Sequence, residues 1–485
     1  MADLSPAQTP ILSSKSKTSL VIPFVFSQKS VDTSIWENVQ LQWSSSLLDH
    51  INQLFATEEH PAGNGIICDV YRLHKQKRDS FGLPKNESNT FHLLNDKGME
   101  WTFKVEDIQL FLFESYVGFL VYDIIHTQSQ MEEIVTLNYQ LKHLQHFDKG
   151  RLITQKEKFT GAEAEPRNFA SITVQLLTDF AVEHYFSSLQ HEPKVATVFN
   201  FVLIDKGFKQ EADHHQKLHY HLFQLTHSYK TSYRPAADKL NADRNDSHIE
   251  LFENSYWGVS FEGMTNLAFL TEDKQNNAFF LGNYRHNMKT YFHLYILALH
   301  QRFGLLHFNS LASQLPYSDE ILLDGEHDRK VTIPKLRKRI NFFILRCYFL
   351  HVSNITHQQQ LYNKLATTLN IPELKSDLAV ELDALFSIAE IEKQFVQEKE
   401  KEQEQKREKQ EQLRREKNAD TVLLYSTVFV IISGISGAWA IIADLFIWNN
   451  EPVVQFPAVY VLVILSVISI ILGMATYYFI KNKWR

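Results

Sequence analysis

The sequence predicts an α+β domain that is followed by a long stalk helix and two transmembrane helices. Three observations lead to this fold class. Segments with strand patterns come first and long helical patterns come later. Residues 381–420 contain neither proline nor glycine. Two apolar stretches, 422–447 and 458–480, each supply the roughly 20 residues that a spanning helix needs.

The composition narrows the class of protein. The chain has 485 residues, of which 44% are apolar, and this fits a globular protein. Its net charge of −7 provides no basic surface for nucleic acid, so we expect no direct nucleic-acid binding. The two cysteines, Cys68 and Cys347, are too few for a disulfide framework and too far apart for a zinc site, which favours a cytosolic domain.

Residues 1–19 are polar, rich in Ser, Thr and Lys, and we expect a disordered tail there, with no signal peptide. Residues 20–370 then form the cytosolic α+β domain. Its strand candidates are 65–73, 108–113, 116–124, 196–204, 218–225 and 256–262, and its helix candidates are 34–55, 128–144, 289–315 and 334–369. Residues 108–124 are typical of a hairpin with Glu114 and Ser115 at the turn. Segments 75–90, 145–168 and 229–250 are polar and are expected to be loops.

Two groups of residues combine aromatic and basic side chains. Tyr233 and Arg234 follow Tyr229, and Tyr284 and Arg285 form the second group. Arginine forks bind phosphates and tyrosine rings stack on bases, so these residues are candidates for binding a nucleotide. Ordinary surface loops have the same composition. No phosphate-binding loop, dinucleotide fingerprint, zincin motif or nucleophile elbow occurs, so we expect no enzyme.

Histidines are concentrated in two places. If residues 218–225 are a strand, His219 and His221 share a face and are weak candidates for binding a metal; surface histidines are the alternative. Histidine also recurs every seven residues from His286 to His307. On a helix, successive members lie roughly 10 Å apart and cannot share one ion, so this pattern predicts a helix-packing or interface stripe.

Residues 371–421 are expected to form a charged stalk helix. Between 398 and 417 nearly every residue is Glu, Lys, Arg or Gln, and these residues favour helix. No apolar residue recurs every 3.5 positions there, so neighbouring copies would not be joined by a coiled coil. Such a helix, continuous with the first span, would act as a lever or as a rigid spacer.

The apolar stretches predict a membrane hairpin. The loop at 448–457 has no Lys or Arg, whereas both outer flanks, including the tail at 481–485, are basic, so both flanks are placed in the cytoplasm. In the first span, Ser433 and Ser436 lie among small residues that allow close helix contact. Several copies could line a pore with this helix; an anchor that dimerises is the alternative. Asp444, with Asn449, Asn450 and Glu451, would lie at the outer mouth and attract cations, or Asp444 would contact headgroups.

The order of these elements resembles the CorA-type magnesium transporter superfamily. The resemblance is carried by the basic, Trp-containing segment 479–485 and by the Pro457-Ala458-Val459 start of the second span. The Gly-Met-Asn signature of that family is absent: Ile442-Ala443-Asp444 occupies its place. A divergent branch without the signature, with an enlarged cytosolic domain, accompanies type III CRISPR systems as membrane effectors, and the chain is similar to this branch.

The resemblance implies a homopentamer in the inner (cytoplasmic) membrane, with both termini cytoplasmic, acting in antiviral defence. Its pore would be opened by a nucleotide second messenger, an AMP conjugate of S-adenosylmethionine. Hydrophobic rings from Leu424, Phe429 or Ile432 would close that pore by dewetting. The alternatives are a transporter of Mg²⁺ or another divalent cation, and a non-conducting, membrane-anchored binding protein.

Overall fold

The chain folds into two units, Met1–Ser387 and Ile388–Arg485, in the computed structural model. The structure describes residues 9–27, 31–32, 34–39, 47–54, 67–83, 90–95, 97–146, 151–160, 167–188, 192–205, 214–230, 232–236, 248–314, 333–447, 463–464, 466–468, 470–471, 473–475, 477–478 and 481.

Within these residues, twelve strands of the first unit form one sheet. The strands are β1 (Lys17–Phe26), β2 (Trp36–Asn38), β3 (Cys68–Leu73), β4 (Phe91–Leu94), β5 (Glu100–Phe113), β6 (Val117–His126), β7 (Arg151–Thr154), β8 (Val182–Tyr185), β9 (Thr197–Ile204), β10 (His248–Phe252), β11 (Ser255–Val259) and β12 (Gly263–Phe269). Their order is β10-β11-β12-β9-β1-β6-β5-β3-β2, while β4 pairs with β5 and β7, and β8 pairs with β1. The pairing of β12 with β9 is parallel, and the other pairings are antiparallel.

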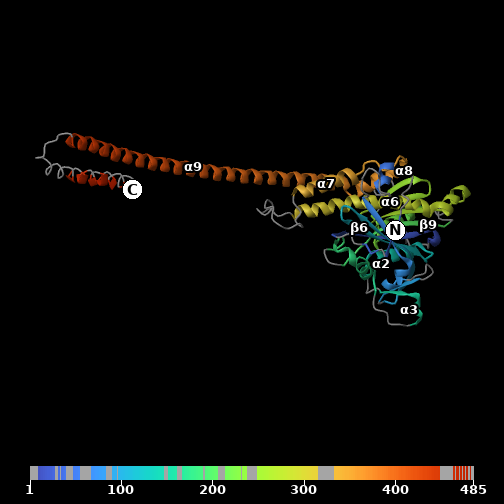
Figure 1. Cartoon of the computed structure of the whole chain (residues 1–485). Coiled ribbons are helices and arrows are strands. Elements are labelled where there is room, and N and C mark those ends of the chain that lie inside the picture. Colours follow the sequence, from blue (N-terminus) through green and yellow to red (C-terminus); the bar gives the residue numbers. More distant parts are fainter. Residues whose placement is uncertain are drawn as a thin grey trace. The chain divides into compact units, whose positions relative to one another are not determined.

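Helices cover both faces of this sheet. They are α1 (Asp49–Leu54), α2 (Met131–Lys142), α3 (Gln155–Thr160), α4 (Phe169–Leu176), α5 (His214–His227), α6 (Lys274–Ser313), α7 (Ile333–Cys347), α8 (Thr356–Thr368) and α9 (Ile371–Ile447), with short 3-10 turns at Ser13–Lys15, Lys75–Phe81 and Thr178–Phe180. Figure 1 shows α6 on one side of the sheet and α2 on the other.

The alternation of side chains along β9 explains this layering. Successive residues of a strand point to opposite faces. Phe199 and Phe201 contact Phe292 and Tyr284 of α6, with ring centroids 5.3 and 5.5 Å apart. Val202 and Ile204 point to the other face and join a buried cluster with apolar side chains of α2 and α5. Both faces of the strand are therefore core.

Several predicted elements are confirmed. The hairpin β5–β6 turns at Glu114 and Ser115, and Tyr116 completes the turn with a φ of 65°. Strands β3, β9 and β11 lie within the predicted segments 65–73, 196–204 and 256–262 to within a residue. Helix α2 falls within 128–144, and α6 includes most of 289–315 but begins earlier, at Lys274.

The prediction of a disordered tail over residues 1–19 is wrong for its second half. A 3-10 turn occupies Ser13–Lys15, and β1 begins at Lys17 in the middle of the sheet. Ile11 is buried, and the hydroxyl groups of Thr18 and Ser19 are hydrogen-bonded to buried polar side chains. Ser and Thr suggest disorder in a sequence, but here their hydroxyls have partners within the core.

Predictions for several further parts of the chain are corrected. Residues 218–225 belong to helix α5 instead of a strand. The helix expected at 34–55 is replaced by β2 and, at its end, by α1. The helix expected at 334–369 is divided into α7 and α8 by a non-helical segment at 348–355. The expected loops at 75–90 and 145–168 contain a 3-10 turn, β7 and α3.

The predicted stalk and first span form one helix, α9, from Ile371 to Ile447. Leu378 and Leu382 are buried, so the start of this helix belongs to the α+β unit rather than to a separate stalk. Among the described residues, one helix is long and apolar enough to cross a membrane, and it is α9. The expected outer loop at 448–457 lies outside the described residues, and only parts of the expected second span at 458–480 and of the tail at 481–485 lie within them.

Candidate functional site

The candidate ligand residues Tyr284 and Arg285 are engaged in contacts within the unit. Tyr284 on α6 is buried, and its hydroxyl donates a hydrogen bond of 2.6 Å to Asn266 Oδ1. Burial raises the pKa of this hydroxyl. The guanidinium of Arg285 contacts both carboxylate oxygens of Glu106 at 2.9 and 3.0 Å. We therefore assign these two residues to packing and charge pairing.

Arg285 belongs to an ionic cluster that the sequence analysis missed. Lys17 Nζ lies 2.6 Å from Asp123 Oδ2 and 3.0 Å from Glu106 Oε2. A register shift between Val105 and Asp107 places Glu106 at an irregularity of β5, and such bulges re-aim a side chain. Burial alone would lower the pKa of Lys17, but the charges of Asp123 and Glu106 outweigh it and the pKa is raised. The cluster joins β1, β5, β6 and α6 by charge.

His219 and His221 do not form the expected pair. They lie on helix α5, where residues two apart point in different directions. His219 Nδ1 lies 3.1 Å from His248 Nδ1 on β10, and His221 Nε2 lies 3.1 Å from Thr9 Oγ1. No group of three potential ligands surrounds a metal position anywhere in the described part of the chain. The proposed shared face depended on a strand that does not form.

The histidine stripe on α6 is a packing stripe, as predicted. His293, His300 and His307 are buried, while His286 is exposed. Burial lowers the pKa of His293 to about 4 and that of His300 to about 3. These imidazoles are neutral near pH 7 and act as polar members of the core.

Tyr233 and Arg234 lie at the open edge of a surface that we call the aromatic–basic cluster. It consists of Tyr139, Lys142, His227, Tyr229, Lys230, Tyr233 and Arg234. Helix α5 ends at His227, and Ser228 leaves it with a φ of 48°, the left-handed conformation that commonly ends helices. Gln224 Nε2 donates to the carbonyl of Tyr233 at 3.0 Å and holds the following loop against α5.

The aromatic rings of this cluster form a chain of contacts. The ring of Tyr229 lies 5.1 Å from that of His227 and 5.8 Å from that of Tyr233, between centroids. Tyr233 is 61% exposed and Arg234 is also exposed. The arrangement presents an open aromatic face with a cation beside it.

Lys142 is the buried member of the cluster. It is the last residue of α2, and its Nζ donates a 2.7 Å hydrogen bond to the carbonyl of His227. The same atom lies 5.4 Å from the centroid of the Tyr229 ring, a cation–π distance. Burial lowers the pKa of Lys142, and the charge of Glu262 partly offsets this. Nothing in the sequence pattern pointed to Lys142, because it lies 85 positions from His227.

Two more contacts complete the charge pattern. Tyr229 donates a 3.1 Å hydrogen bond to Glu262 Oε1, and burial together with this carboxylate raises the pKa of Tyr229. Lys230 Nζ lies 5.3 Å from the centroid of the Tyr139 ring. The cluster thus carries three cations around tyrosine rings, with the carboxylate of Glu262 beside it. It suits a ligand with an aromatic ring and a negative charge.

The candidate pore residues lie on α9. Phe429 and Ile432 are exposed and Leu424 is half-buried. Ser433 Oγ donates to the carbonyl of Phe429 at 2.8 Å, and Ser436 Oγ to that of Ser433 at 2.9 Å. Both hydroxyls are satisfied by the backbone of their own helix, which suits an apolar environment. Asp444 lies near the end of α9, and Asn449, Asn450 and Glu451 lie outside the described residues.

Comparison of the chain with protein-family models, with curated proteins and with solved structures finds no match.

Proposed function

We propose that this chain is a homo-oligomeric membrane effector in which an α+β unit binds a nucleotide-like ligand and a helix passes the signal to an ion pore. The observation that carries the proposal is the continuity of α9. This helix starts among buried side chains of the α+β unit, at Ile371 and Leu378, and continues to Ile447 through an apolar stretch. A rigid helix is suited to transmit a small displacement over a long distance.

The ligand class follows from the aromatic–basic cluster. Tyr233 offers an exposed ring on which a base can stack, and Arg234 offers a planar fork for a phosphate or carboxylate. Because Lys142 caps α5 and also contacts Tyr229, a ligand at Tyr229 would act on the ends of α2 and α5 together. The proposed ligand is an AMP conjugate of S-adenosylmethionine, the messenger that the resemblance to CRISPR-associated CorA-like effectors implies.

The proposed pore is formed by the apolar part of α9 from several copies, and the proposed number of copies is five. The absence of the Gly-Met-Asn signature argues against selective Mg²⁺ transport, because Asp444 supplies a carboxylate but not the same set of oxygens. A divalent-cation transporter is the second candidate, and Asp444 near the end of α9 is the feature that favours it.

Ligand-dependent flux tests the proposal. The full chain is reconstituted in liposomes, and the flux of K⁺, Na⁺ and Mg²⁺ is measured with and without the AMP conjugate, with ATP as a second probe. Binding is measured in parallel by calorimetry on the protein in detergent. We expect flux only with the conjugate, and we expect Tyr233→Ala to weaken binding by about fivefold or more, since stacking on a base contributes about 1–3 kcal/mol.

Phe279→Ala is the matched control, because Phe279 is an exposed aromatic residue on α6 outside the cluster. It should leave binding unchanged. Equal losses in both variants would contradict the assignment of the cluster as the ligand site. Constitutive Mg²⁺ flux would favour the transporter, and liposomes that stay silent despite ligand binding would favour a non-conducting binding protein.

A further inference from the structure

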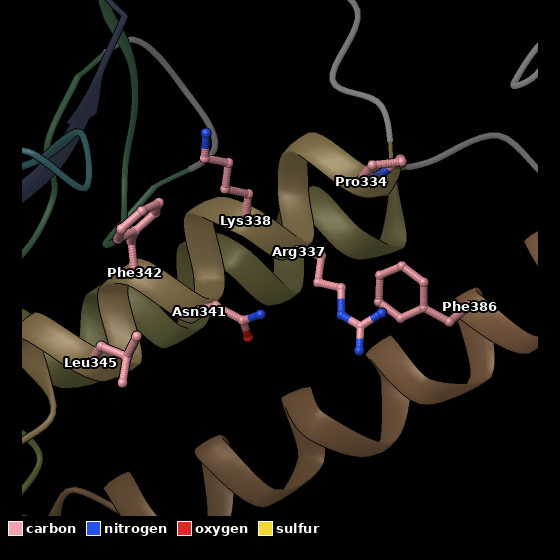
Figure 2. Close-up of a pocket in the computed structure, with 7 residues that line it drawn as sticks. All are labelled: Pro334, Arg337, Lys338, Asn341, Phe342, Leu345 and Phe386. Carbon is pink, nitrogen blue, oxygen red and sulfur yellow. The ribbon is translucent and has the colours of Figure 1, made fainter.

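A groove lies in the α+β unit between α7 and the first part of α9, residues 371–387. Its volume is about 440 Å³. Figure 2 shows the side chains that line it, which are Pro334, Arg337, Lys338, Asn341, Phe342, Leu345 and Phe386. None of these residues belongs to the aromatic–basic cluster or to the ionic cluster, so the groove is a separate feature.

The outer face of α7 is unusually apolar for a surface. Phe342 is 51% exposed and Leu345 is 78% exposed. The core side of the same helix is already filled by Leu336, Ile340 and Phe343, which are buried. No rotation of α7 about its axis would bury both its core-facing and its outer apolar side chains. Exposed apolar side chains in a group indicate an interaction surface.

The charged side chains of α7 are all basic. Five of its fifteen residues are basic and none is acidic. The guanidinium of Arg337 lies over the ring of Phe386 at 4.2 Å, and Lys338 Nζ lies 5.9 Å from the centroid of Phe342. Among the described residues, neither Arg337 nor Lys338 forms an ion pair. The groove thus presents two exposed cations beside apolar rings.

The first part of α9 carries the opposite charge. Glu373, Asp377 and Glu381 are exposed and spaced four residues apart, so they form one stripe on the helix. None of the three forms an ion pair among the described residues, and like charges at this spacing destabilise a helix. Asp377 and Phe386 are nine residues apart, about two and a half turns, so the stripe lies on the other side of α9 from the groove.

We propose that the groove binds the acidic stripe of α9 from a second copy of this chain. Within one copy the two surfaces lie on opposite sides of α9 and cannot meet. Between copies, the cations of the groove would pair with Asp377 and Glu381, while Phe342 and Leu345 would be covered. Each copy would use its groove for one neighbour and its stripe for the other, and such head-to-tail contacts form a closed ring where the rotation between neighbours closes. This inference rests on the proposed function in one respect, because both require that copies of the chain assemble.

Charge exchange tests this interface in the full chain, purified in detergent, with the mass of the assembly measured by native mass spectrometry and analytical ultracentrifugation. The groove variant is Arg337→Glu with Lys338→Glu, and the stripe variant is Asp377→Lys with Glu381→Lys. We expect each to weaken assembly by about tenfold or more, because like charges then face each other. The chain with all four substitutions should assemble again. A mixture of the two variants should also assemble, with the variants alternating, because each groove then faces a stripe of opposite charge. Leu345→Ser should weaken assembly without a change of charge.

Lys274→Glu with Lys289→Glu is the matched control, since these two exposed lysines lie on α6 outside the groove. It should leave the mass unchanged. Circular dichroism and binding of the AMP conjugate check that each variant is folded. An unchanged mass for the groove variant, or failure of the fourfold variant to reassemble, would overturn the interface while leaving the proposed function intact. A monomeric wild-type chain would overturn both. Loss of binding to phosphatidylserine vesicles with an unchanged mass would replace the second copy by an anionic membrane surface.

Discussion

The imidazole of His300 on α6 stacks on the ring of Phe113 at the end of β5. The ring centroids are 3.7 Å apart and the planes are inclined by 13°. His300 Nε2 also shares a 2.8 Å hydrogen bond with Ser115 Oγ in the turn between β5 and β6. One buried histidine therefore fastens the long helix to the tip of the central hairpin, and burial lowers its pKa to about 3.

This contact predicts that the unit loses stability in acid. The folded pKa of His300 lies below the value of about 6.5 in an unfolded chain, so the unfolded state binds more protons below pH 6.5. The free energy of unfolding should therefore fall as the pH drops from about 6.5 towards 3, by about 1.4 kcal/mol per pH unit for this group. Urea unfolding at pH 7.5 and pH 5.0 measures it. His300→Gln should lose about 2 kcal/mol less than the wild type over this interval.

His286→Gln provides the control for that measurement, because His286 is exposed on the same helix. Its stability should change with pH as that of the wild type does. If His300→Gln keeps the full pH dependence, the imidazole is not held neutral in the folded unit.

The ionic cluster predicts a large effect of Lys17. Lys17→Met removes the cation between Asp123 and Glu106. Glu106 keeps Arg285, but the buried Asp123 loses the cation it pairs with. We expect a loss of about 3 kcal/mol in the free energy of unfolding, since breaking a buried pair leaves an uncompensated charge. Lys158→Met is the comparison, because Lys158 pairs with Glu100 nearer the surface, and it should cost about 1 kcal/mol or less. Equal costs would contradict the assignment of Lys17 to a buried cluster.

Two glycines should respond in opposite directions to alanine. A Cβ at Gly118 on β6 would lie 2.4 Å from Phe24 Cζ, inside the core, so Gly118→Ala should cost about 1–3 kcal/mol. A Cβ at Gly282 on α6 would meet no atom within 4 Å, so Gly282→Ala should gain about 0.5–1 kcal/mol through helix propensity. Urea unfolding of both variants measures the difference. A stable Gly118→Ala variant would show that Phe24 has room to move.

The proposed pore predicts a role for Asp444. Neutralising it with Asp444→Asn should lower cation flux several-fold in liposomes and weaken the preference for cations over anions, because a ring of carboxylates would be lost. Glu404→Gln in the charged part of α9 should leave both properties unchanged. Unaltered conductance and selectivity in Asp444→Asn would contradict the carboxylate ring.

Local sequence patterns determined the elements whose periodicity is unambiguous. The alternation around Glu114 and Ser115 predicted the β5–β6 hairpin, and the absence of proline and glycine from residues 381–420 predicted an unbroken helix through that part of α9. The pattern failed at 218–225, where histidine and apolar residues alternate as in a strand. Leu218, Leu222 and Leu225 also recur with helical spacing, and packing against α2 and β12 selects the helix.

The sites depended on contacts between distant parts of the chain. The sequence alone placed Tyr229, Tyr233 and Arg234 together, because they are neighbours along the chain. Only the tertiary structure placed Lys142 beneath Tyr229, engaged Tyr284 and Arg285 in contacts within the unit, and set the acidic stripe of α9 opposite the groove of α7. The physical reason is that local periodicity records which side of an element is apolar, whereas the pairing of strands and helices is decided by burying all of these sides together.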